Sequence, residues 1–215
     1  MKTLALTGLL ALAITITANA SSLITLTGVQ GTSDGADYVL PYHLTIQGIQ
    51  NSAGGDTFDA TCYDFFDTMS IGESWQANLL TVDQAATSGK FAGDPDALSN
   101  YKLVAALSSF YTPATTPQGQ IDLQHAIWDV FDPGQFTVDA GMHGYLDQAN
   151  GISGSLDYAN FVFVESTVPG IQEFVIDPVP VSDTPEPGTL LMALGGMALV
   201  LVFIRLAHMD RASLS

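Results

Sequence analysis

The chain contains one cysteine, Cys62, and its surroundings decide whether that thiol is inert or reactive. Residues 58–66 are rich in aromatic and β-branched side chains, which predicts a strand that carries Cys62. A lone buried cysteine often behaves as a small hydrophobic residue without any chemistry. A thiol that meets a suitable partner group can instead act as a nucleophile. Both interpretations stay open, and Gln124, at the expected start of a helix, is the second residue of chemical interest.

Two short segments resemble the paired signatures of a known family. Thr61-Cys62-Tyr63-Asp64 has a cysteine followed by an aromatic residue and an acid, and Leu123-Gln124-His125-Ala126-Ile127-Trp128 has a Gln-x-Ala-Ile-Trp pattern. This pairing resembles the bacterial surface thioester domains. The resemblance implies an internal thioester between the sulfur of Cys62 and the side-chain carbonyl of Gln124, and it implies an adhesion function.

Such a bond places physical demands on the fold. A glutamine amide is a poor electrophile, so a thiol expels ammonia from it only where the two side chains are held together. We expect Asp122 to cap the helix, which would place the Gln124 carbonyl near unpaired helix N–H groups. Trp128 lies four residues further on, on the same helix face, and is expected to shield the bond. Tyr63 should point to the opposite face of the strand from Cys62.

Other chemistry finds less support in the sequence. The histidines have no His-x-x-x-His or Cys/His spacing, and there is no P-loop, dinucleotide fingerprint or Gly-x-Ser-x-Gly motif. His125 lies about 100° around the helix from Gln124, so we do not assign it as a base. Asp64, Asp67 and Glu73 are expected on solvated strand edges and turns. We therefore expect no enzyme activity, no cofactor and no metal ion.

The pattern of the remaining residues predicts a mainly β domain of α+β class, a sandwich or barrel interrupted by a helical insertion. Runs of alternating apolar residues between turn-forming residues indicate the strands, at 22–29, 38–49, 58–66, 74–82, 160–165 and 171–176. Cap and proline signals indicate helices at about 94–111, with Asp94 as cap and Pro95 in the first turn, and at 122–131 and 139–150.

The N-terminus is typical of a secretory signal peptide. Met1-Lys2 is followed by an apolar stretch at residues 4–16 and by Ala18-Asn19-Ala20, a small-x-small cleavage site. We expect cleavage after Ala20.

The C-terminus resembles the PEP-CTERM sorting signal. Pro185, Glu186 and Pro187 precede an apolar run at 190–206, and arginines follow it. The resemblance implies that an exosortase, a membrane protease, removes this tail during export. Before processing the apolar run would anchor the chain in the inner membrane, with the basic end on the cytoplasmic side.

These signals divide the chain into five parts. They are a signal peptide (1–20), an extracytoplasmic thioester-like domain (21–177), a linker with the Pro-Glu-Pro motif (178–189), a transmembrane sorting helix (190–206) and a cytoplasmic tail (207–215).

The body of the chain is strongly acidic. Twenty of the 22 acidic residues and only two of the five basic ones, Lys90 and Lys102, lie between residues 21 and 183, which gives a net charge of −18 there. Binding to nucleic acid or to an anionic membrane surface is disfavoured by this charge. We expect an exported bacterial protein of the cell envelope, cell surface or extracellular matrix. It would be either an adhesion module that reacts with surface amines or hydroxyls, or a non-covalent structural protein associated with exopolysaccharide.

Truncation after Asp183 tests the sorting signal. The shortened chain is expected to fold normally but to change in surface retention or processing, because the deletion removes the Pro-Glu-Pro element and the apolar run and none of the expected strands. The intact mass of the mature exported protein checks processing of the full chain. If residues 190–215 remain in that form, a plain membrane anchor replaces the sorting signal.

Overall fold

The computed structural model describes residues 21–51 and 54–176, which belong to one compact unit. Among these residues, no helix is both long enough and apolar enough to span a bilayer. The expected signal peptide, linker, sorting helix and tail, with Ala20, Pro185, Glu186 and Pro187, lie outside the described residues and stay predictions.

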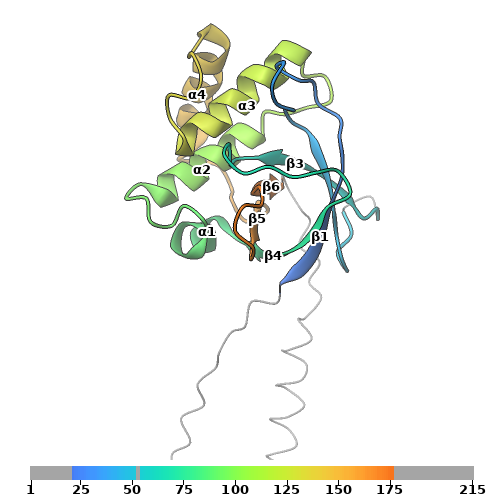
Figure 1. Cartoon of the computed structure of the whole chain (residues 1–215). Coiled ribbons are helices and arrows are strands. Elements are labelled where there is room, and N and C mark those ends of the chain that lie inside the picture. Colours follow the sequence, from blue (N-terminus) through green and yellow to red (C-terminus); the bar gives the residue numbers. More distant parts are fainter. Residues whose placement is uncertain (1–20, 52–53, 177–215) are drawn as a thin grey trace, which may run out of the picture. The chain divides into compact units, whose positions relative to one another are not determined.

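The strands form a closed antiparallel barrel (Figure 1). Of the two expected architectures, sandwich and barrel, the structure has the barrel. Its strands follow one another around the barrel in the order β1-β2-β3-β6-β5-β4. Their bounds are β1 Ser22–Val29, β2 Tyr42–Ile46, β3 Thr57–Cys62, β4 Ser74–Leu80, β5 Val162–Ser166 and β6 Phe174–Ile176. Closure pairs β4 with β1, so that neither of these strands leaves an unpaired edge.

Alternation of apolar residues builds the interior of the barrel. In β2, Tyr42, Leu44 and Ile46 are buried while the residues between them are partly exposed, which is the period-2 pattern of a strand with one buried face. Together with Trp75 of β4 and Phe174 of β6 they belong to one apolar cluster, here called the barrel core.

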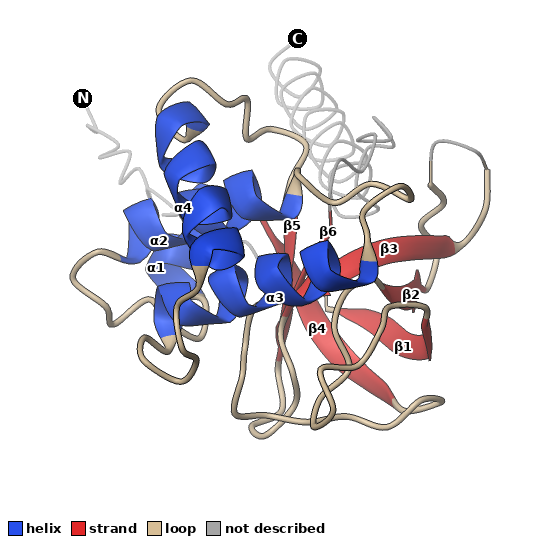
Figure 2. Cartoon of the chain, turned by 90° about the horizontal axis from the view of Figure 1, so that it is seen from above, coloured by secondary structure: helices blue, strands red, loops and turns tan. Residues whose placement is uncertain are grey.

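Four helices fill the connection from β4 to β5 and lie together on one side of the barrel (Figures 1 and 2). They are α1 Val82–Ser88, α2 Ala97–Ser108, α3 Pro117–Phe131 and α4 Ala140–Ile152. The helices pack around a second apolar cluster, the helix-side core, which includes Tyr101, Leu107, Leu123 and Ile127. The expected helical insertion is therefore confirmed.

Several expected strand boundaries are wrong for identifiable reasons. β2 begins at Tyr42 rather than residue 38, and Pro41 just before it has no N–H to donate to a strand ladder. β3 ends at Cys62 rather than 66. Val82 belongs to α1, where Thr81 and Gln84 form a capping box that the strand interpretation overlooked.

Two expected helix caps are also wrong. α2 begins at Ala97 with Asp96 at the cap position, and Asp94 instead accepts hydrogen bonds from the Asp96 backbone and the Asn100 side chain. α3 begins at Pro117, capped by Thr116, whose hydroxyl accepts from the Gly119 N–H at 3.1 Å. The expected cap of α4, Asp139, is confirmed.

Substitutions at Thr116 and Asp122 test where α3 begins. Thr116→Ala should lower the free energy of unfolding by about 1 kcal/mol because it removes the cap. Asp122 lies inside the helix and accepts from Gln118 at 2.6 Å, so Asp122→Ala should lose about 0.5 kcal/mol or less, the worth of one such pair. Urea unfolding followed by tryptophan fluorescence measures both values, and a larger loss at Asp122 than at Thr116 would contradict the observed start.

Candidate functional site

Cys62 is the last residue of β3 and points into the barrel core. It is fully buried and pairs with Phe174 of β6. Its thiol donates a hydrogen bond to the backbone carbonyl of Asp64, with Sγ and O 3.0 Å apart. The next residue, Tyr63, belongs to the helix-side core. This confirms that the two side chains point to opposite sides, and it places Cys62 at the boundary between the two cores.

Gln124 of α3 is held directly against Cys62. Its side-chain nitrogen donates to the carbonyl oxygen of Cys62 at 2.6 Å, and its side-chain oxygen accepts from the backbone N–H of Leu40 at 3.2 Å. Gln124 is fully buried. Because a C–N bond measures about 1.33 Å, the amide carbon lies within about 4 Å of the Cys62 carbonyl oxygen. The structure therefore brings the two predicted partners together.

The carbonyl of Gln124 is polarised by a different group from the one expected. Asp122 does not cap α3, so Gln124 lies in the middle of the helix, away from its unpaired N–H groups. The N–H of Leu40, in the loop between β1 and β2, takes that position instead. Asp122 lies beside Gly141 of α4, where an added Cβ would come within 2.0 Å of its carboxylate, so it contributes to helix packing and not to the site.

Three neighbouring side chains of α3 hold the β1–β2 loop in place. Gln120 accepts from the N–H of Thr32 at 3.2 Å, Gln124 accepts from Leu40, and His125 lies 2.9 Å from the carboxylate of Asp34. His125 thus has a structural partner away from the Cys62 sulfur. The contacts of this loop were not predicted, although two glutamines and a histidine close together on a helix indicate polar contacts there.

Aromatic rings cover the pair on the side of Trp128. Trp128 is 1% exposed and belongs to the barrel core with Cys62. The rings of Phe65 and Phe136 pack on it, with centroids at 5.3 and 5.6 Å. The shielding role expected for Trp128 agrees with this position. Its indole N–H has no oxygen or nitrogen partner among the described residues.

The electrostatics of the site keep the thiol protonated. Burial raises the pKa of the Cys62 thiol well above its ordinary value, and the nearby carboxylates of Asp64 and Glu173 raise it further. The indole N–H of Trp128 and the backbone contact at Asp64 oppose this rise. A folded chain with a free Cys62 would therefore resist thiol reagents even without any bond to Gln124.

Asp64 is buried, contrary to the expected solvated position. It is 1% exposed and forms an ion pair with Lys90, which also contacts Asp67 at 2.7 Å. Burial raises the pKa of Asp64, and the ammonium of Lys90 opposes that rise. The pairing fixes the segment whose backbone carbonyl accepts from Cys62, so Lys90 positions the site although it does not touch the thiol.

A second buried acidic group lies behind Tyr63. Glu165 accepts from the hydroxyls of Tyr63 and Tyr101 at 2.6 and 2.8 Å. Glu173 is 4% exposed, and burial together with the charge of Glu165 raises its pKa to about 9. The Ser166 N–H donates to Glu173 at 2.7 Å and opposes this rise.

No protein-family model and no curated protein matches the chain. Among solved structures, it is similar to the N-terminal thioester domain of a surface protein from Clostridium perfringens, with 9% sequence identity and a TM-score of 0.45, over 74% of this chain and 99% of that chain. A likeness of this degree carries no conclusion about function, which has to come from the site itself.

The buried carboxyl of Glu173 should make stability depend on pH. Its folded-state pKa of about 9 lies above the ordinary value of 4.5, so the folded chain holds this proton more tightly than the unfolded chain. The resulting stabilisation is fully present below about pH 4.5 and is lost as the pH rises toward 9, by at most about 1.4 kcal/mol per pH unit. Glu173→Gln removes this titration and should flatten the decline, as measured by urea unfolding across that range. Equal slopes in the two proteins would contradict the assignment.

Proposed function

We propose that this chain is an exported adhesion module of a bacterial cell surface or matrix, and that it carries an internal thioester between Cys62 and Gln124. The observation that carries the proposal is the contact of the Gln124 carboxamide with Cys62, at 2.6 Å from nitrogen to backbone oxygen, with both residues fully buried. A buried glutamine on a helix has many possible partners, and here it meets the chain's one cysteine.

The bond would form by an exchange that leaves no charge behind. The sulfur of Cys62 attacks the amide carbon of Gln124, the carbon–nitrogen bond breaks, and the nitrogen departs as ammonia with the former thiol proton. The Leu40 N–H stabilises the negative charge that develops on the Gln124 oxygen. Fixed positions of the two side chains replace an unfavourable encounter by an intramolecular step.

The same burial would preserve the bond once formed. A thioester is hydrolysed where water reaches its carbonyl, and here neither residue has exposed surface. Trp128, Phe65 and Phe136 cover one side. A protected acyl group that reacts with an amine or hydroxyl on a target surface would give covalent attachment, which is the adhesion function we propose.

The proposed location rests on the ends of the sequence. A signal peptide cut after Ala20 would export the body, and the motif of Pro185, Glu186 and Pro187 would direct the chain to an exosortase. Both segments lie outside the described residues. The net charge of −18 over residues 21–183 favours solubility, which agrees with the proposed location outside the cell.

Intact mass of the purified body tests the bond. The protein should weigh one ammonia less than its sequence requires. Methylamine should add to the acyl group of Gln124 as an amide and should release the Cys62 thiol. Resistance of Cys62 to alkylation cannot serve as the readout, because burial alone protects it.

Two variants serve as controls for this measurement. Cys62→Ala and Gln124→Ala should each show the full sequence mass and take up no methylamine, while their circular dichroism stays close to that of the parent. If the parent protein also has its full sequence mass, the thioester does not form. The remaining interpretation would then be an acidic, non-covalent matrix protein with an inert buried thiol.

A further inference from the structure

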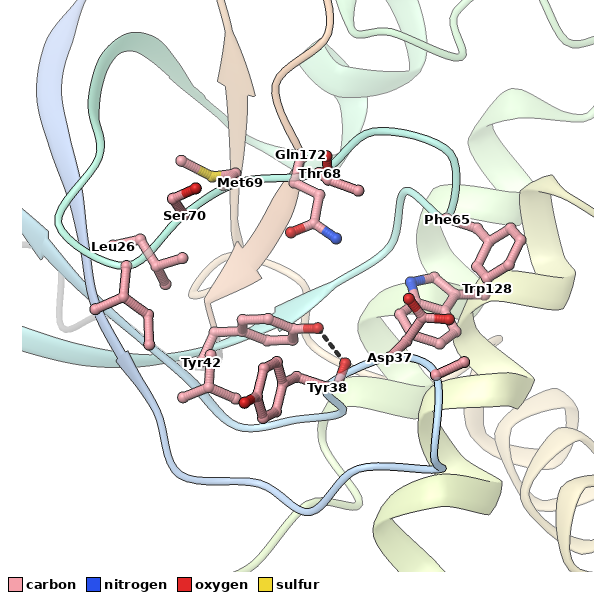
Figure 3. Close-up of a pocket in the computed structure, with 13 residues that line it drawn as sticks. Leu26, Asp37, Tyr38, Tyr42, Phe65, Thr68, Met69, Ser70, Trp128 and Gln172 are labelled. Carbon is pink, nitrogen blue, oxygen red and sulfur yellow. Dashed lines mark hydrogen bonds between the residues drawn. The ribbon is translucent and has the colours of Figure 1, made fainter.

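A cleft of about 410 Å³ lies between the β1–β2 loop and the segment that joins β3 to β4 (Figure 3). Its volume falls within the range of about 300–1,000 Å³ that is usual for small-ligand pockets. Polar side chains lie on both sides of the opening, namely Asp37, Tyr38 and Tyr42 on one side and Thr68, Ser70 and Gln172 on the other. Neither Cys62 nor Gln124 lines the cleft, so it is separate from the buried pair.

Hydrogen bonds within each wall hold the cleft in shape. In the β1–β2 loop, the N–H of Asp37 donates to the carboxylate of Asp34 at 2.8 Å. In the opposite wall, the N–H of Ser70 donates to the carboxylate of Glu73 at 2.9 Å. A pocket whose walls are fixed before binding loses little entropy when a ligand enters.

Two large apolar side chains are exposed at this cleft, one from each wall. Tyr38 is 62% exposed and Ile71 is 61% exposed. Single exposed apolar residues are common on protein surfaces. Exposed apolar residues that share a hollow with polar groups are instead typical of ligand-binding grooves.

Tyr38 provides the open aromatic surface of the cleft. Trp128 is 1% exposed, and the rings of Phe65 and Phe136 pack against it. Tyr42 is 4% exposed. An aromatic cage for a quaternary ammonium needs several open ring faces around the cation, and the described lining residues do not offer them. One open ring is enough for a flat ligand that stacks on it.

The polar side chains of the cleft are free to bind a ligand. Four of them have no hydrogen-bond or ion-pair partner among the described residues: Asp37, Thr68, Ser70 and Gln172. A carboxylate accepts hydrogen bonds, whereas a hydroxyl and a carboxamide both donate and accept them. The Trp128 N–H does not belong to this set, because it lies near the Cys62 thiol and lowers the pKa of that group. An apolar ligand would leave the four groups without partners, which is unfavourable.

The charge of the domain disfavours an acidic ligand. The net charge is −18 over residues 21–183, and none of the residues that line the cleft is basic. Uronic acids and sulfated sugars would therefore be repelled. An uncharged ligand that has many hydroxyls fits both the charge and the polar groups.

We propose that this cleft is a non-covalent binding site for a neutral saccharide. The ring of Tyr38 stacks on one face of a sugar, and the side chains of Asp37 and Gln172 bind its hydroxyls. A pyranose ring has C–H groups on its faces and hydroxyls around its edge, so it needs an aromatic surface next to donors and acceptors. The site goes beyond the function proposed above, because binding of a glycan requires no thioester.

Binding of the mature exported protein to an array of neutral oligosaccharides tests this assignment. The array contains chains of glucose, galactose, mannose and N-acetylglucosamine, and calorimetric titration measures the Kd of each sugar that binds. Tyr38→Ala should weaken binding about tenfold, because it removes the stacking surface. Asp37→Ala should also weaken it about tenfold, because it removes hydrogen bonds to a charged group. Tyr38→Phe keeps the ring and should leave the Kd unchanged.

Two matched variants serve as controls. Phe66 is 63% exposed, nearly the same as Tyr38, but does not line the cleft, so Phe66→Ala should leave the Kd unchanged. Asp147→Ala on α4 removes a charge at an exposed position away from the cleft and should also have no effect. Competition by the monosaccharide distinguishes the two sources of the ligand. Strong inhibition identifies a free sugar, and weak inhibition identifies a polysaccharide chain.

The outcomes separate this proposal from the thioester. Binding to no member of the array, or binding that Tyr38→Ala and Asp37→Ala leave unchanged, would overturn the saccharide site. Choline that binds where no sugar does would overturn it as well and would indicate a cation site. Cys62→Ala should bind the saccharide with the Kd of the parent. A full sequence mass in the parent protein would therefore overturn the thioester and leave the saccharide site in place.

Discussion

The site depends on how α3 is positioned against the end of β3. Two hydrogen bonds of the Gln124 side chain fix that position. Gln124 donates to the backbone of Cys62 and accepts from the backbone of Leu40. A buried amide that lost either partner would cost about 1–3 kcal/mol, so the helix, the strand and the β1–β2 loop have to settle together. Burial of Gln124 thus makes one polar group specify the arrangement of three segments.

The division into two apolar cores explains why this position exists. Cys62 faces the barrel core and Tyr63 faces the helix-side core, so the chain passes from one to the other at the end of β3. α3 does the same along its length: Leu123 and Ile127 belong to the helix-side core, whereas Trp128 belongs to the barrel core. A thiol and an amide placed at this seam are dry on both sides and lie on rigid elements.

Sequence periodicity predicted the barrel strands and the helical insertion, because each depends on local patterns. The start of α3 differs from the expected residue 122, although Thr116 and Pro117 are themselves a cap and a first-turn proline. The partner of the Gln124 oxygen was beyond sequence reasoning, since Leu40 lies 84 residues away and contributes only its backbone. Burial of Asp64 was also not predicted. Its ion-pair partner, Lys90, follows α1, a helix that was not expected.

The acidic, dry surroundings of Cys62 also make charge on its sulfur costly. A thiolate is costly there, because burial and the charges of Asp64 and Glu173 raise the pKa of the thiol. Formation of a thioester avoids that cost, since a neutral thiol and a neutral amide give a neutral bond and neutral ammonia. Opening the bond demands the charged sulfur, and the Trp128 N–H is a donor that lowers the pKa of this thiol. Because the thiolate is the attacking species, formation of the proposed bond and its opening would both depend on how well the Trp128 N–H stabilises charge on the sulfur.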